Sequence, residues 1–309
     1  ALRWAQHGVE LSAEDEAAVA YLELGQALMR LSRLAEARDA FREAVSAARA
    51  GGQAVEEGRG LAGEALSIQL LGDFAGAVPL FVQASEIAER TADLEGLVMA
   101  KGNLAYQFLL AEQYDRAEDA LRTCLRIEQQ LGLSQHEPYT LAYLGDLRSM
   151  RGDHTEGLSL LNRALELAGP SYPRCESQVL IRRGDVELRM GEPHAALASY
   201  SRADEILREF SSTWVEIDCN NGLAETRLAL GDPETAALLF QRARAASDEV
   251  GDPYESARAL VGLGEISLQA GNVEVALEQW EAAALLFARL GSPAADRLSA
   301  RVAELRGAS

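Results

Sequence analysis

The sequence of 309 residues predicts an all-α solenoid, in which helical hairpins stack one after another. Three observations support this prediction: an internal period of about 40 residues, columns of small and large apolar side chains that recur in each period, and a glycine turn between the helices of most periods. The composition agrees, because 48% hydrophobic and 25% charged residues are typical of a globular chain and not of a disordered one.

The second helix of each hairpin is predicted from three columns. A small residue is followed four residues later by a large apolar one and seven residues later by another small one, and this spacing puts all three on one helical face. The first column is Ala37, Ala77, Ala117, Gly157, Ala196, Ala236 and Ala276; the second is Phe41, Phe81, Leu121, Leu161, Tyr200, Phe240 and Trp280; the third is Ala44, Ala84, Cys124, Ala164, Ala203, Ala243 and Ala283.

The first helix of each hairpin carries another column of small residues, twelve positions before the alanine column. Small side chains at matched places let two helix backbones approach closely, so the two helices are expected to pair in antiparallel fashion. The members of this column are Gly25, Ala65, Ala105, Gly145, Gly184, Ala224 and Gly264.

The turn between the two helices has its own signature. Gly72-Asp73 and its equivalents place a glycine where one helix ends and an acidic or amide side chain where the next one is capped. Pro193 and Pro233 then occupy a first helical position, where proline is tolerated. Repeats one and three lack the glycine, with Ser32-Arg33 and Glu112-Gln113, so their turns are expected to be built differently.

These residues resemble the tetratricopeptide repeat (TPR) family. The resemblance rests on Tyr21, Leu24, Gly25, Ala37, Phe41 and Ala44 with their later equivalents, and covers about residues 18–290. It implies a right-handed superhelical solenoid of about seven helix-turn-helix hairpins whose first helices line a concave groove. The period of 40 departs from the usual 34 residues and is similar to that of longer TPR variants. A HEAT or armadillo array, which has a similar period, is the alternative fold.

A narrower resemblance concerns the C-terminal half. The segments 144–146 and 263–265, with the closing segment 290–296, resemble the C-terminal TPR arrays of actinobacterial antibiotic-regulatory proteins and large ATP-binding transcriptional regulators. That resemblance implies a sensor or autoinhibitory region. Its partner would be a DNA-binding or nucleotide-binding module of a longer parent protein.

The repeat register divides the chain into three parts. Residues 1–17 are expected to form the trailing helix of a preceding or partial repeat, residues 18–290 the seven repeats, and residues 291–309 a C-terminal capping helix and tail. The links at 131–138 and 169–173 are the expected places for a bend.

The charge of the chain argues against two classes of partner. With 29 Lys+Arg and 48 Asp+Glu the net charge is −19, so direct binding to nucleic acid or to an anionic membrane surface is not expected. No apolar run is long enough to span a bilayer. Cys124, Cys175 and Cys219 have neither zinc-site nor disulfide-framework spacing, which favours a reducing cytoplasm.

Catalytic motifs give no support for an enzyme. The segment 58–63, GRGLAG, matches the dinucleotide fingerprint in spacing but opens a predicted helix with no strand before it, so no cofactor is expected. The four histidines lie singly, no metal-ligand spacing is present, and no nucleophile motif appears. We therefore expect a non-catalytic protein without cofactor or metal.

The candidate binding residues of the second half are acidic. Asp146, Asp185, Glu225 and Glu265 follow the small column of the first helices, where the TPR resemblance implies that side chains point into the groove. A negative stripe there would favour a cationic protein or peptide. Alternatively each carboxylate is solvated or locally paired, as Asp185 with Arg189 at i+4.

The candidate residues of the first half are apolar. Leu22, Leu66, Tyr106 and Tyr143 are expected in the groove, where they would accept an apolar or amphipathic partner.

Three functions follow from this pattern. The first is a non-catalytic scaffold that binds a protein or peptide in its groove, as the sensor or regulatory region of a bacterial transcriptional regulator or signalling protein. The second is a receptor for a small effector or signalling peptide that changes the conformation of the superhelix. The third is a stand-alone adaptor that assists an enzyme complex.

Overall fold

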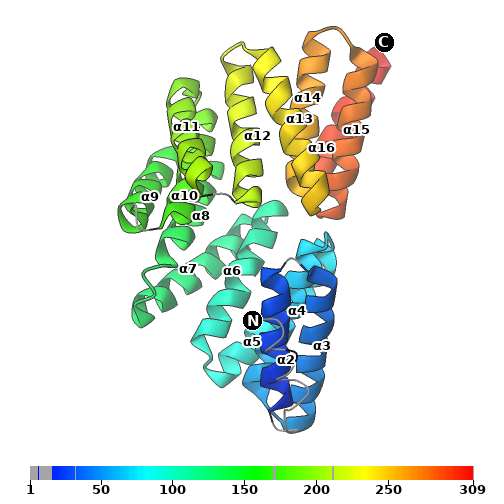
Figure 1. Ribbon diagram of the computed structural model, residues 1–309. Helices are drawn as coiled ribbons and strands as arrows, with labels where there is room; N and C mark the ends of the chain where they lie inside the picture. Colours follow the sequence, from blue (N-terminus) through cyan, green and yellow to red (C-terminus); the bar gives the residue numbers. More distant parts are fainter. Residues whose placement is uncertain (1–5, 7–15, 32, 170–171, 211, 309) are drawn as a thin grey trace. The chain divides into compact units, whose positions relative to one another are not determined.

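A computed structural model describes residues 6, 16–31, 33–169, 172–210 and 212–308, and these residues form an all-α fold (Figure 1). Successive helices pair as seven antiparallel hairpins, followed by a final helix. The helices are α2 (Ala17–Arg30), α3 (Leu34–Gly51), α4 (Ala54–Leu70), α5 (Phe74–Thr91), α6 (Leu94–Leu110), α7 (Tyr114–Leu131), α8 (Glu137–Met150), α9 (His154–Ala168), α10 (Pro173–Arg189), α11 (Pro193–Glu209), α12 (Thr213–Ala229), α13 (Pro233–Val250), α14 (Pro253–Gln269), α15 (Val273–Arg289) and α16 (Ala294–Ala308).

The repeating columns form the core of each hairpin. Every alanine of the first column has 0% of its surface exposed, and every large residue of the second column has 4% or less exposed. The large side chain packs against small residues: a Cβ on Gly25 would lie 2.7 Å from Phe41, and one on Gly184 would lie 2.6 Å from Tyr200. The small columns are therefore required by the close approach of paired helices, and the predicted all-α solenoid of hairpins is confirmed.

The turns show the expected glycine conformation. Gly72, Gly152, Gly191, Gly231 and Gly271 all have φ between 76° and 89°, in the left-handed region. The Asp73 carboxylate caps the following helix by accepting a hydrogen bond from the Gly76 N–H at 2.9 Å.

The third turn corrects one expectation. Glu112 adopts the same left-handed conformation without being glycine (φ 55°), and Gln113 N donates to Phe108 O as Asp73 N donates to Ile68 O. The turn of repeat three is therefore built like the others, because the hydrogen bonds that end the helix fix the backbone even against the preference of the side chain. Ser32 of repeat one lies outside the described residues.

The glycines of the segment 58–63 have a packing role. They lie inside α4, where an added Cβ would lie 3.0 Å from Ile87 at Gly58, 2.8 Å from Val45 at Gly60 and 2.5 Å from Phe41 at Gly63. Two of the three positions thus face the preceding helix α3, and Gly58 faces α5. Helix packing accounts for the glycines that match the dinucleotide fingerprint.

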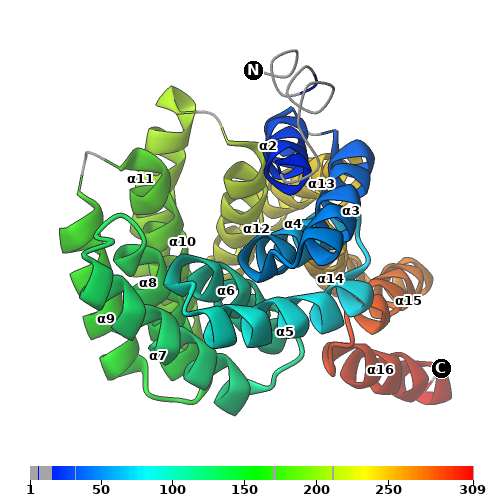
Figure 2. The same cartoon turned by 90° about the horizontal axis from the view of Figure 1, so that it is seen from below.

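The chain divides into two compact units, residues 1–127 (unit 1) and 128–309 (unit 2). Within each unit the first helices of successive hairpins contact one another directly: α2 with α4 and α4 with α6 in unit 1, and α8 with α10, α10 with α12 and α12 with α14 in unit 2 (Figure 2). The surface formed by α8, α10, α12 and α14 is called the inner face of unit 2 below.

The two ends of the chain and the links between hairpins are described only in part. Most of the expected helix at residues 1–17 lies outside the described residues. The final helix α16 packs against α15, and its role as a cap stays a prediction. The expected bend at 131–138 or 169–173 stays a prediction. Among the described residues, no helix combines the length and hydropathy needed to cross a membrane.

Two glycine substitutions in unit 1 separate packing from helix propensity. We expect Gly63→Ala to lower the free energy of unfolding by about 1–3 kcal/mol, because the new Cβ overlaps the buried Phe41 ring. Gly102→Ala is the matched control in α6, since an added Cβ there meets nothing within 4 Å, and a gain of up to about 1 kcal/mol is expected. Urea unfolding followed by circular dichroism measures both; equal effects of the two substitutions would contradict the packing role.

Candidate functional site

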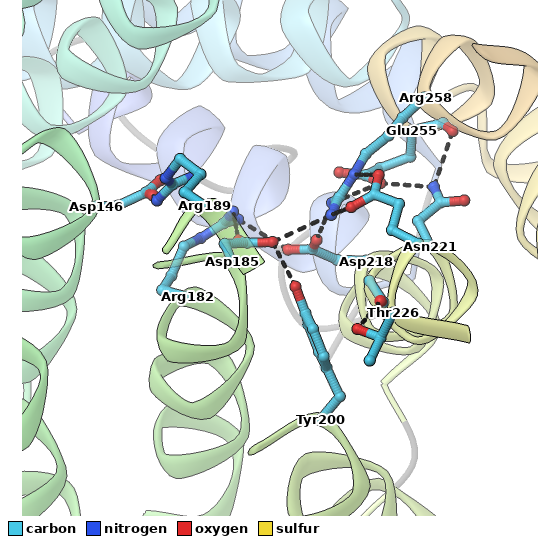
Figure 3. Close-up of polar contacts among 12 residues, drawn as sticks. Asp146, Arg182, Asp185, Arg189, Tyr200, Asp218, Asn221, Thr226, Glu255 and Arg258 are labelled. Carbon is cyan, nitrogen blue, oxygen red and sulfur yellow. Dashed lines mark hydrogen bonds and ion pairs between the residues drawn. The ribbon is translucent and has the colours of Figure 1, made fainter. Parts of the chain in front are cut away.

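A network of arginines and carboxylates covers the inner face of unit 2 (Figure 3). Each first helix contributes side chains at spacings of three, four or seven residues, which place them on one face of that helix. The members of this inner-face network are Asp146 on α8, Arg182, Asp185 and Arg189 on α10, Asp218 and Glu225 on α12, and Glu255 and Arg258 on α14.

Arg258 is the centre of the network. Its guanidinium binds Glu225 through two hydrogen bonds of 2.7 and 2.9 Å, Asp218 at 2.7 Å and Asp185 at 3.1 Å. A fourth carboxylate, that of Glu255, lies 3.5 Å away. The side chain is only 14% exposed, so one half-buried cation joins carboxylates from α10, α12 and α14.

The other two arginines extend the network to α8. Arg182 donates to Asp185 at 3.1 Å and to Asp218 at 2.8 Å, and its guanidinium lies 5.9 Å from the centre of the Tyr143 ring. Arg189 donates to Asp146 and, at 2.9 Å, to the hydroxyl of Ser149. Together the three arginines connect four first helices in succession.

The pKa values of Asp185 and Asp146 are shifted in opposite directions. Burial opposes the ionisation of Asp185, but Arg258, Arg182 and Arg189 outweigh it, so the pKa of Asp185 is lowered. Burial also raises the pKa of Asp146, and there the attraction of Arg189 and Arg182 does not compensate. Asp185 is thus held ionised by the arginines that surround it, and the Tyr200 hydroxyl donates a further hydrogen bond to it at 2.7 Å.

Glu255 is a buried carboxyl of the network with a strongly raised pKa. Burial, followed by the repulsion of Asp218, raises its pKa to about 8, although Arg258 acts in the opposite direction. The Asn221 amide donates to the Glu255 carboxyl at 2.8 Å and to the Glu255 backbone carbonyl at 2.9 Å, while the Asn221 Oδ1 atom is buried without a hydrogen-bond partner. A proton on Glu255 reduces the repulsion among the crowded carboxylates.

The structure brings together three of the four predicted acidic residues and pairs all four with arginine. Asp146 and Asp185 are 4% and 8% exposed and belong to the network, as does Glu225. Glu265 lies apart from it and pairs with Arg301 of α16 through two hydrogen bonds, one of 2.9 Å. The predicted stripe of negative charge therefore carries its own counterions.

The predicted pair of Asp185 with Arg189 is replaced by three other pairings. Arg189 turns to Asp146 of the preceding hairpin, and Asp185 binds Arg182 at i−3 and Arg258 two hairpins further on. The reason is tertiary: the first helices lie side by side, so a carboxylate of the neighbouring helix competes with one on the same helix.

The apolar candidates are divided between the units. Leu22 in α2 is buried at 8% exposure, and Leu66 and Tyr106 are half-buried on α4 and α6 of unit 1. Tyr143 is on α8 of unit 2, beside Arg182, and burial raises its pKa. The structure therefore does not bring the four together as one apolar surface within a unit.

Three central residues were missing from the sequence prediction. Asp218 and Arg258 lie seven residues before Glu225 and Glu265, two turns earlier on the same face, so the acidic column itself could have pointed to them. Arg182 occupies a column in which Gly63, Gly222 and Gly262 stand in other repeats, and that departure was the available signal.

Metal-site and thiol chemistry are the two kinds of reactivity that the described residues allow us to assess. No group of three or more His, Cys, Asp or Glu side chains within the described ranges has the arrangement of a metal site. The three cysteines are buried; burial raises the pKa of Cys175 to about 11 and that of Cys219 further, so both stay protonated at neutral pH. A protonated thiol is a poor nucleophile.

Comparison with known proteins agrees with the repeat pattern. Residues 9–54 and 221–306 match the tetratricopeptide repeat family. The chain has a tetratricopeptide-repeat fold. No curated protein matches it by sequence.

Three solved structures are similar to the chain in fold. NprR in complex with its cognate peptide NprX has a TM-score of 0.70 at 12% identity, over 99% of this chain and 91% of that one. The apo form of RapI has a TM-score of 0.68 at 14% identity, over 88% of this chain and 98% of that one. The apo form of the quorum sensor NprR from B. thuringiensis has a TM-score of 0.61 at 12% identity, over 98% and 92%. At such identities the likeness concerns the fold.

Removal of the central arginine is expected to destabilise unit 2. Arg258→Met leaves Asp185, Asp218 and Glu225 without their shared counterion, and breaking a buried ion network in this way costs about 3 kcal/mol or more. Arg306→Met is the control, because Arg306 pairs with Glu281 at the surface and little change is expected there. Urea unfolding gives the free energy of unfolding of both variants. If Arg258→Met left it unchanged, the network would not be a stabilising element.

The raised pKa of Glu255 predicts a pH dependence. Glu255 holds its proton up to about pH 8 in the folded state, whereas an unfolded glutamate has a pKa of 4.5. The contribution of this proton to the free energy of unfolding is therefore complete below pH 4.5 and is lost as the pH rises towards 8. We expect the wild type to lose stability relative to Glu255→Gln between pH 5 and pH 8, at up to about 1.4 kcal/mol per pH unit. Urea titrations across this range give the free energy of unfolding of both proteins. If the two free energies changed in parallel with pH, the raised pKa of Glu255 would be contradicted.

Proposed function

We propose that the chain is a non-catalytic TPR scaffold that binds a protein or peptide on the inner face of unit 2. The observation that carries the proposal is the position of Arg258, which touches side chains of α10, α12 and α14 at once. A ligand that competes for any of these contacts changes the interactions of several hairpins together. Such coupling is what a sensor needs in order to convert binding into a change of shape.

The proposed biological setting is regulatory. In this proposal the chain is the sensor region of a bacterial cytoplasmic transcriptional regulator or signalling protein, and a DNA-binding or nucleotide-binding module of a longer parent protein is its intramolecular partner. The support is the narrow resemblance of the closing repeats and the fold shared with NprR, which is a quorum sensor solved with a peptide.

A receptor for a small signalling peptide is the second candidate. It is favoured by the same network, because the contact of Arg258 with Asp185 reaches from α14 back to α10, across an intervening hairpin. A peptide that rearranged this contact would alter the spacing of the hairpins.

The charge of the partner forms a separate part of the proposal. A cationic partner is supported by the carboxylates of the inner-face network: with Glu255 protonated, four of them remain beside its three arginines. Against it stand the ion pairs of Asp146, Asp185, Glu225 and Glu265, each of which a cationic ligand would have to replace.

Hydrogen exchange tests the location of binding. A partner retained by the chain from host extract, and identified by mass spectrometry, is expected to protect the amides of α8, α10, α12 and α14 at saturation. The second helices α9, α11, α13 and α15 are the internal control, because they lie behind the inner face and should keep their exchange rates. Protection confined to the second helices, or the absence of any retained protein or peptide, would overturn the proposal.

A further inference from the structure

A pocket opens on unit 2 between α12, α14 and the final helix α16. Its volume is about 660 Å³, within the range of about 300–1,000 Å³ that is usual for a binding pocket. The apolar lining comes from Leu228, Val261, Phe287 and Leu298, and the charged rim from Glu225, Arg258, Glu265, Arg297 and Arg301. This cavity is called the α14–α16 pocket below.

Three helices form the walls of the pocket. The helix α16 packs against α15 as α14 packs against α13, and its Arg301 reaches Glu265 on α14. The ion pair of Glu265 with Arg301 spans the opening, and Arg301 also lies over the Trp280 ring at 4.0 Å. Arg301 is 41% exposed, so a ligand in the pocket can reach it.

The charge at this rim differs from that of the chain as a whole. The lining holds three arginines and two glutamates, but Arg258 is already bound by carboxylates of α10 and α12, so the cationic part of the rim is its α16 edge, with Arg297 and Arg301. The pair with Glu265 uses two of the five N–H donors of the Arg301 guanidinium. An acidic group is therefore the complement of this rim, and an apolar side chain is the complement of the floor.

The geometry of a peptide limits how these two groups can be combined. In an extended chain successive side chains point to opposite faces, and residues two apart share a face with a separation of about 7 Å. An extended segment also passes from one helix to the next, about 8–10 Å away, within about three residues. The acidic residue should thus stand two positions from the apolar one.

We infer that the α14–α16 pocket binds an extended internal segment of a partner protein, with a large apolar side chain on the floor and an aspartate or glutamate two residues away at Arg301. This inference rests on the proposed function, since it names the chemistry of the partner at one end of the inner face.

A library of random dodecapeptides displayed on phage tests the inference. The peptides are fused through their C-termini, so that none presents a free terminal carboxylate, and they are selected on the immobilised full chain. We expect enrichment of an acidic residue two positions from Leu, Ile, Met or Phe.

Four variants locate the binding. Ala229→Trp fills the pocket from an exposed position on its edge, and Arg301→Gln removes the charge; both are expected to lose the enriched phage. Ala300→Trp and Arg306→Gln are the matched controls, because both residues lie on α16 outside the pocket lining and should leave the selection unchanged. Circular dichroism and melting curves confirm that all four variants fold.

An enriched sequence is then made as an amidated synthetic peptide and measured by fluorescence anisotropy. Arg301→Gln is expected to weaken its binding at least tenfold. Replacing the acidic residue of the peptide by its amide should weaken binding to the wild type equally, and should have no further effect on Arg301→Gln. Independent, additive effects of the two changes would show that the acid binds elsewhere.

The remaining outcomes separate this inference from the proposed function. Enriched peptides that bind Ala229→Trp and Arg301→Gln as well as the wild type overturn the inference and leave the scaffold proposal in place. Enrichment of basic residues also overturns it and supports the cationic partner. Enrichment with acid and apolar residues three or four apart indicates a helical ligand and overturns the extended one. No enrichment overturns the inference, and the hydrogen-exchange experiment then decides on the scaffold alone.

Discussion

The packing of one large side chain against small residues is the constraint on which the fold depends. In unit 1 the Phe41 ring lies so close to Gly25 of its own hairpin and to Gly63 of the next that a Cβ at either place would overlap it. In unit 2 the Tyr200 ring lies in the same way between Gly184 and Gly222. One side chain thus holds a hairpin together and joins it to its neighbour. Repetition of this contact produces stacked hairpins without any need for contacts distant in sequence.

The polar network uses the surface that this packing creates. Because first helices of successive hairpins lie against one another, side chains on their common face meet across gaps of 33 to 73 residues, as those of Arg258 do with Glu225, Asp218 and Asp185. A half-buried arginine that binds several carboxylates is costly to remove, because the carboxylates then lose a counterion while they stay buried. Asp185 and Asp218 also bind Arg182, so a ligand that displaced Arg258 from them would leave each with a second donor.

The two ends of the inner face in unit 2 differ in chemistry. Around Arg182 and Asp185 polar groups are engaged with one another, whereas the α14–α16 pocket has an apolar floor, and Arg297 and Arg301 lie at its α16 edge.

The sequence by itself determined the all-α hairpin stack, because the small and large columns are local patterns that only one kind of helix pair satisfies. It also explained the glycine turns. Glu112 takes the same left-handed conformation without being glycine, because the hydrogen bonds of the helix end outweigh the side-chain preference. Only the tertiary structure decided the pairing of charges. The sequence suggested Arg189 as the partner of Asp185, but the neighbouring helices brought Asp146 to Arg189 and Arg258 to Asp185, and on its own helix Asp185 binds Arg182 instead. Ion pairs depend on which helices lie side by side within a few ångströms, and the distance along the chain does not report that.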